Sequence, residues 1–136
     1  MAILAAVLVP TVTSKIKQAN QSSANSEASS YANSIKTDII ALQSNISSSL
    51  DLLKIGGDSS NAVNVGNGTG TTAIYAQFDA TKMDGGSGAK KDHTTFSITT
   101  DGKFKVSTTV GGATVDYTVT VDTTNGKITV SEPTYN

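Results

Sequence analysis

The chain has 136 residues, which suits one domain, and its 10 Lys, 11 acidic residues and absence of Arg leave a net charge of −1. Proteins that bind nucleic acid usually concentrate positive charge and use Arg, so this balance argues against that class. The chain has no Cys and a single His, which excludes disulfides, thiolate catalysis and Cys-ligated zinc and leaves little for acid–base chemistry near neutral pH.

The first zone, residues 2–53, predicts one long helix. No Gly interrupts it, and its only Pro is Pro10. Within Ala28–Leu53 the apolar residues recur at steps of three and four, which gives a single apolar stripe. The glycine pair at 56–57 supplies the stop signal. A helix of this length would span roughly 78 Å at 1.5 Å per residue, so we expect one end to protrude from the domain.

The second zone, about Gly56–Asp92, is rich in glycine and predicts a long connecting loop. One island within it, Thr72–Phe78, predicts a short strand. Loops of this length in small domains are usually functional, variable or poorly ordered, so we expect this zone to be the variable part of the chain.

The third zone, Thr94–Ser131, alternates apolar and polar residues and predicts four strands. Three turn signals separate them, namely Asp101-Gly102, Gly111-Gly112 and Asn125-Gly126. We therefore expect an antiparallel four-stranded meander with one apolar face, which the helix stripe must cover. The predicted fold class is α+β, with a long N-terminal α-helix packed on this sheet.

The turn chemistry also predicts the register of the strands. A three-residue loop ending at a left-handed Gly102 sets Ile98 opposite Phe104, and a two-residue turn at Gly111-Gly112 sets Val110 opposite Ala113 and Val106 opposite Tyr117. A two-residue turn at Asn125-Gly126 sets Val121 opposite Val130 and Thr123 opposite Ile128. The expected helix–sheet core is Ile35, Ile39, Leu42, Ile46, Phe96, Ile98, Phe104, Val106, Tyr117, Val119, Val121, Ile128 and Val130.

The N-terminus carries a family resemblance. The run AILAAVLVP at positions 2–10 is similar to the second half of the N-terminal segment of bacterial type IV pilins and pseudopilins. The polar, basic stretch Thr11–Asn20 resembles the next part of that segment. The layout derived above, a long helix, a connecting loop and an antiparallel sheet, is also that of the family. The chain has no Cys-bounded C-terminal region, and in this respect it resembles a Gram-positive type of pilin.

The resemblance implies a division of the chain. Residues 1–55 would be the N-terminal assembly helix, with 1–27 protruding and 28–55 packed on the sheet. Residues 56–93 would be the variable loop, and 94–136 the sheet head. The residues expected to mediate filament assembly are Ile3, Leu4, Val7, Leu8, Val9 and Pro10. Unpartnered apolar surface needs another molecule, and Pro10 should kink or loosen the helix.

The function implied by the resemblance is that of a structural subunit of an extracellular, cell-surface filament. Its partners would be copies of itself and an assembly machinery in the membrane, with no nucleic acid and no small-molecule substrate. The family's leader peptide, Gly cleavage site and early acidic residue are missing, so we expect this chain to lack the start of the mature segment. The apolar run here is too short to span a bilayer, whereas a full-length form would be membrane-anchored before assembly.

Two alternative functions remain open from the sequence. One is a pseudopilin of a type II secretion or competence system, which shares the fold. The other is a cell-surface carbohydrate-binding or adhesion module that uses the sheet, although the absence of Trp weakens it.

We expect no catalytic site, no cofactor and no enzymatic activity. His93 has no Cys to pair with, and no Ser–His–Asp set is recognised around it. We predict that His93 lies on the surface before the first strand. Asp79, Asp84 and Asp92 leave a calcium site open, without a recognisable ligand spacing.

Overall fold

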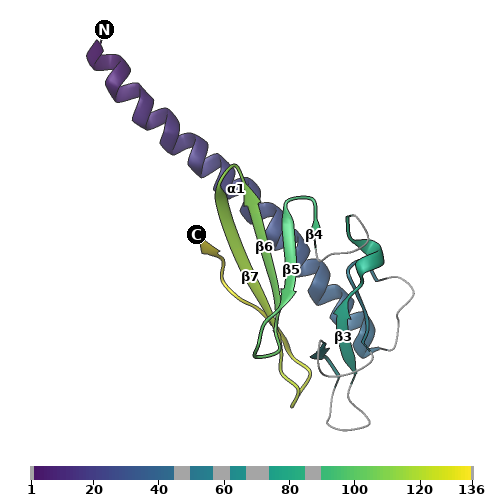
Figure 1. The fold of residues 1–136 in the computed structure, drawn as a ribbon. Coiled ribbons are helices and arrows are strands. Elements are labelled where there is room, and N and C mark those ends of the chain that lie inside the picture. Colours follow the sequence, from purple (N-terminus) through teal and green to yellow (C-terminus); the bar gives the residue numbers. More distant parts are fainter. Residues whose placement is uncertain (1, 45–49, 57–61, 67–73, 85–89, 136) are drawn as a thin grey trace.

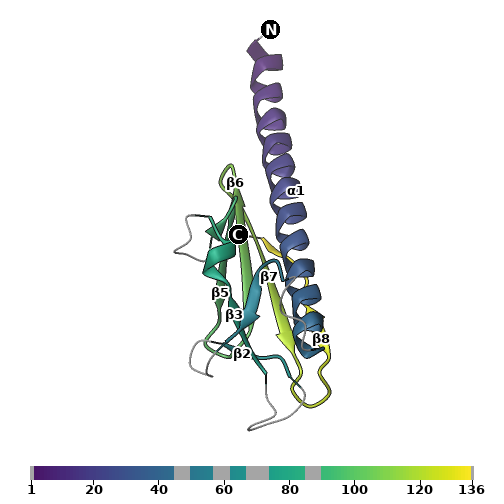
Figure 2. The same cartoon turned by 90° about the vertical axis from the view of Figure 1, so that its right-hand side faces the viewer.

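The protein is an α+β structure with one long helix and two antiparallel sheets (Figure 1). The computed structural model describes the backbone of residues 2–44, 50–56, 62–66, 74–84 and 90–135, and side chains from position 15 onward within these ranges. Helix α1 (Ala2–Gln43) has 42 residues, about 63 Å at 1.5 Å per residue. Its C-terminal half runs along one face of the larger sheet, and its N-terminal part extends beyond it (Figure 2).

The larger sheet, sheet B, has six strands rather than the predicted four. The four expected strands are present as β5 (Thr94–Ile98), β6 (Phe104–Val110), β7 (Ala113–Val121) and β8 (Ile128–Val130). Two short strands were not predicted. The first, β4 (Lys90–Lys91), pairs with β5, and the second, β9 (Thr134–Tyr135), pairs with β7. Strand β7 is longer than β8, so it has room for both β8 and β9 along the same edge.

The predicted register is confirmed for the first three expected strands. Ile98 lies opposite Phe104, Val106 opposite Tyr117, and Val110 opposite Ala113. Gly102 is left-handed, with φ of 77°, and its N–H donates to the carbonyl of Thr99, as the three-residue loop requires.

The predicted register of β8 is wrong by two residues. Val121 lies opposite Ile128, and Val119 lies opposite Val130. The reason is a longer turn, in which the Gly126 N–H donates to the carbonyl of Asp122 at 2.7 Å with Gly126 left-handed at φ 73°. Because side chains alternate with a period of two, a shift of two residues leaves each side chain on its predicted face.

The second zone, together with the residues just before it, forms a sheet rather than a single strand. Sheet A consists of β1 (Leu53–Ile55), β2 (Val63–Asn64) and β3 (Tyr75–Phe78), in the order β1-β3-β2. Strand β3 lies within the predicted island 72–78, and a short 3₁₀ helix, η2 (Ala80–Lys82), comes after it. This zone therefore contributes to the core.

Helix α1 ends at Gln43 rather than near Leu53, which lies in β1 instead. The apolar residues that extended the predicted stripe, Leu50 and Leu53, are buried, and Leu52 is buried between them. These leucines are therefore buried in a segment that returns beside α1, rather than on a continuation of the helix. The short-range pattern does not distinguish the two arrangements.

The core lies between α1 and the apolar face of sheet B, and it extends beneath sheet A. Of the predicted core residues, Ile35, Ile39, Leu42, Phe96, Phe104, Val106, Tyr117 and Val119 are buried. Ile98, Val121, Ile128 and Val130 are partly buried and pack against them, whereas Ile46 lies outside the described residues. The second zone adds Val63, Val65, Ala76 and Met83.

An aromatic cluster joins the two sheets and the helix. The ring of Phe78 from sheet A lies 5.3 Å from that of Phe96 and 5.4 Å from that of Phe104, both in sheet B. Tyr31 of α1 meets Phe96 edge to face at 5.2 Å. Phe96 therefore contacts all three layers, and aromatic pairs of this geometry stabilise beyond simple burial.

Replacing Phe96 by Ala should lower the free energy of unfolding by about 3–5 kcal/mol, because it leaves a cavity at the meeting point of the three layers. The matched control is Thr95→Ser on the neighbouring exposed position of β5, which should cost less than about 1 kcal/mol. Urea unfolding monitored by circular dichroism measures both. Equal losses in the two variants would show that the cluster does not join the layers energetically.

Candidate assembly interface

The N-terminal part of α1 has no partner among the described side chains. Residues 15–19 are all exposed, and since these five positions cover more than one helical turn, every face of the helix is open there. Ile16 is 57% exposed, although it is a large apolar residue. Among the described side chains of α1, those from position 15 onward, the first buried one is Ala24. The sheet therefore holds the helix from that point onward and leaves the preceding segment projecting (Figures 1 and 2).

The predicted assembly residues belong to this projecting segment. The backbone of α1 includes positions 3–10 and continues through Pro10 without interruption, so the expected loosening there does not break the helix. The side chains of Ile3, Leu4, Val7, Leu8, Val9 and Pro10 lie outside the described side chains, and their role in assembly stays a prediction.

Small residues hold the helix against sheet B where it enters the head. Ala24, Ala28 and Ala32 are fully buried, and small side chains let a helix approach a neighbour closely. At the end of this contact, the Asn20 Nδ2 donates to the carbonyl of Gly111 at 3.4 Å. Gly111 is left-handed at φ 56°, and a Cβ there would collide with the Asn20 amide.

The other end of α1 is fixed by two polar side chains. The carboxylate of Asp38, 3% exposed, accepts the backbone N–H groups of Asp51 at 3.3 Å, Leu52 at 2.8 Å and Leu53 at 3.1 Å. The Gln43 Nε2 donates to the carbonyls of Val65 and Gly126 at 2.8 and 3.0 Å. These contacts anchor the returning chain, sheet A and the β7–β8 turn to the helix.

A third polar contact ties the side of α1 to the β4–β5 turn. The Glu27 carboxylate lies 3.4 Å from Nδ1 of His93 and accepts the Thr94 hydroxyl at 3.2 Å. His93 is exposed immediately before β5, as predicted. The Tyr31 hydroxyl donates to the carboxylate of Asp92, a residue with a left-handed φ of 55°. Burial, together with this hydrogen bond and the nearby acidic charges, raises the pKa of the Tyr31 phenol.

The three aspartates considered for calcium each accept a hydrogen bond from within the chain, Asp92 from Tyr31 as described above. Asp79 caps η2 by accepting the Thr81 N–H at 3.0 Å and the Thr81 hydroxyl at 2.6 Å, and these bonds lower the pKa of its carboxyl. Asp84 accepts the N–H of Asp92 at 2.7 Å. Across the described part of the chain, no three His, Cys, Asp or Glu side chains are placed to hold a metal ion together.

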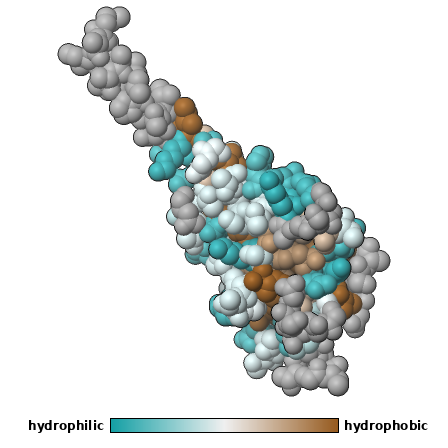
Figure 3. Space-filling view, in the orientation of Figure 1, coloured by the Kyte–Doolittle hydropathy of each residue, from teal (hydrophilic) through white to brown (hydrophobic). Residues whose placement is uncertain are grey.

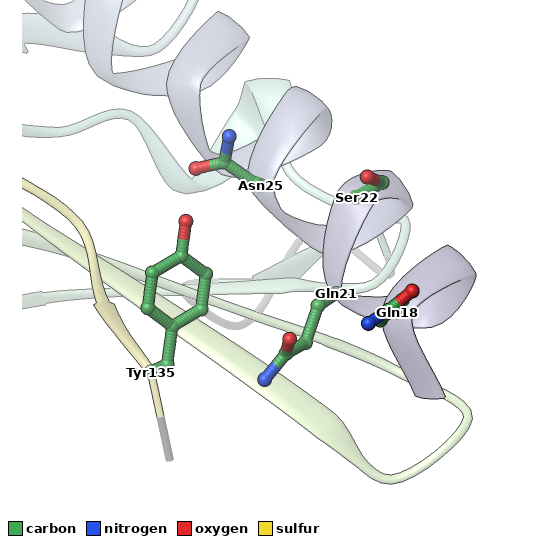
Figure 4. A pocket seen from close by; sticks show the side chains of 5 residues that line it. All are labelled: Gln18, Gln21, Ser22, Asn25 and Tyr135. Carbon is green, nitrogen blue, oxygen red and sulfur yellow. The ribbon is translucent and has the colours of Figure 1, made fainter. Parts of the chain in front are cut away.

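A polar groove lies where α1 leaves the head. It has a volume of about 340 Å³ and is lined by Gln18, Gln21, Ser22 and Asn25 of α1 and by Tyr135 of β9 (Figure 4). Its two sides come from opposite ends of the chain, so no local sequence pattern indicates it. On the face of the head that Figure 3 shows, hydrophilic and neutral residues are mixed, with apolar ones mainly where the two sheets adjoin.

Comparison with known protein families, with curated proteins and with solved structures finds no match to this chain. Among the helices that the structure describes, none combines the length and apolar character that crossing a membrane requires.

Replacing Asp38 by Asn should lower the free energy of unfolding by about 1–3 kcal/mol, because the amide has one acceptor oxygen for three buried N–H donors and loses the charge. The matched control is Asp51→Asn, on an exposed side chain in the same segment, which should be nearly neutral. Urea unfolding compares them. A neutral Asp38→Asn variant would show that the carboxylate does not anchor the returning chain.

The raised pKa of Tyr31 predicts a loss of stability at alkaline pH. The unfolded phenol ionises near pH 10 whereas the folded one holds its proton, so stability is present below about pH 10 and falls as the pH rises further. Tyr31→Phe should reduce this fall, and Asp92→Asn, which removes the hydrogen-bonded charge but keeps the burial, should give an intermediate slope. Urea unfolding between about pH 9 and pH 12 measures the slopes; identical slopes in all three proteins would contradict the assignment.

Proposed function

We propose that this protein is a structural subunit of a type IV pilus-like extracellular filament and that it polymerises through the N-terminal part of α1. The observation that supports this most is the projecting helix. Residues 15–19, the described side chains nearest the N-terminus, are exposed on every face and so lack tertiary packing, and helices of under roughly 12–15 residues are marginal on their own in water. A partner along this segment would supply the missing packing.

The sequence of the projecting segment supports the same partner. Positions 2–9 contain only Ala, Ile, Leu and Val, and such an apolar run gains free energy by leaving water. The alanines permit close helix approach, as small residues do in helix packing within membranes. Copies of one chain present identical segments to one another, so they can gather in a shared apolar core while their sheet heads remain outside.

The head supports the proposal because its described core is built on the C-terminal half of α1. Its core, the Asp38 anchor and the Gln43 bridge all lie at or beyond Ala24. In this proposal the head is the outer shell at the cell surface, and the membrane machinery that assembles such filaments is its second partner. A secretion pseudopilin would use the same helix, and differs in what the filament moves rather than in how it is held together.

The test uses the chain's lack of Cys, because any introduced Cys is unique. Leu4→Cys and Leu8→Cys should form disulfide-linked dimers on mild oxidation, since the proposed contact places copies of this segment together. The control Thr129→Cys, on an exposed position of β8, should remain mainly monomeric. Non-reducing electrophoresis measures the linked fraction, and equal linking at all three positions would mean random collision.

A deletion of residues 2–10 separates assembly from folding. Sedimentation should show concentration-dependent association of the full chain and its loss in the deletion variant, while thermal unfolding of the head stays close to that of the full chain. If the deletion variant associates as the full chain does, the helix tip is not the assembly surface and the proposal fails.

A further inference from the structure

The groove between α1 and β9 carries chemistry that filament assembly does not use. Its five lining side chains are all uncharged, and each carries a hydrogen-bonding group. Three of them are carboxamides, from Gln18, Gln21 and Asn25, and each offers donors and an acceptor side by side. The volume of about 340 Å³ lies at the lower end of the range of roughly 300–1,000 Å³ found for small-ligand sites.

Hydrogen bonding within the head orients one of these amides. The Tyr117 hydroxyl donates to Oδ1 of Asn25. This bond fixes which end of the amide meets the sheet and leaves the Nδ2 donor for another partner. Figure 4 shows Gln21 and Asn25 extending from the helix on the side where Tyr135 lies. A donor oriented before binding costs less entropy to use than a free one.

Tyr135 forms the opposite wall of the groove. Its place is set by β9, which pairs it with Val115 of β7. It is 51% exposed, although it is a large aromatic residue. A tyrosine supplies an apolar ring face and a polar hydroxyl on one side chain, so the groove offers a single flat apolar surface among hydrogen-bonding groups.

We infer that this groove is a binding site for a neutral saccharide. A sugar ring presents hydroxyls that donate and accept together, which matches the carboxamides, and an apolar C–H face, which matches the ring of Tyr135. The uncharged lining gives a phosphate or a metal ion no opposite charge to bind. A peptide would need apolar pockets for its side chains, and the lining offers one ring only. The inference is independent of the proposed filament, because all five residues belong to one chain.

The test is a titration of the intact 136-residue chain with maltohexaose, cellohexaose and chitohexaose, monitored by amide chemical shifts in NMR. At least one of the three should cause saturable shifts at positions 18–25 and 135. Tyr135→Ala should raise its Kd at least tenfold, and Gln21→Ala should raise it severalfold. The control Thr129→Ala, on exposed β8, should leave Kd unchanged.

Each other outcome overturns the inference. Saturable shifts with none of the three saccharides, or shifts that persist in Tyr135→Ala, would mean that the groove does not bind sugars. Shifts at the groove that depend on protein concentration rather than saccharide would identify a second copy as its occupant. To keep a folding defect from passing as lost binding, the Tyr135→Phe variant retains the ring and should keep most of the affinity.

Discussion

The structure depends on the burial of one apolar sheet face against one helix. Sheet B presents its apolar residues on a single side, and α1 packs against them together with Phe78 of sheet A. Since the strands of sheet B have at most nine residues while α1 has 42, the sheet can cover only part of the helix. The projection of the N-terminal part of α1 therefore results from a mismatch in length. The projecting segment is helical as a continuation of the C-terminal half of α1, which is packed against the sheet.

The contacts that fix α1 in the head change along its length. Near the exit, buried alanines and the close approach of Gly111 to Asn20 bring the helix near the sheet, and hydrogen bonds from Tyr117 to Asn25 and from Thr94 to Glu27 add polar contacts. Toward the C-terminal end, larger residues such as Ile39 fill the core, and Asp38 and Gln43 bind backbone groups of the chain that returns. Apolar packing and hydrogen bonds therefore act together at both ends of the contact between α1 and the head.

Much of the third zone could be predicted from the sequence because its signals are local. Alternation placed residues such as Phe104 and Val119 on the buried face, and glycine turns set the register of adjacent strands. The register of β8 failed because the turn closes on a backbone bond between Gly126 and Asp122, which side-chain identity does not specify.

The features that could not be predicted depend on contacts between distant residues. The end of α1 is set by the Asp38 carboxylate binding N–H groups more than ten residues away, and the strands of sheet A are two to four residues long. Strands that short carry almost no periodic signal, so only tertiary pairing reveals them. The same holds for the groove, since Gln21 and Tyr135 become neighbours only after β9 pairs with β7.

The groove lies at the base of the projecting helix, so the two proposed activities would use neighbouring residues of α1. Gln18 lies in the segment exposed on every face, while Asn25 is already held by Tyr117. The groove therefore spans the boundary between the unsupported and the supported helix. Packing of another copy along the projecting segment as far as this boundary would place that copy beside Gln18, in one wall of the groove. The two proposed activities therefore share one stretch of α1, and a copy packed as far as Gln18 would become part of the surface that a ligand in the groove meets.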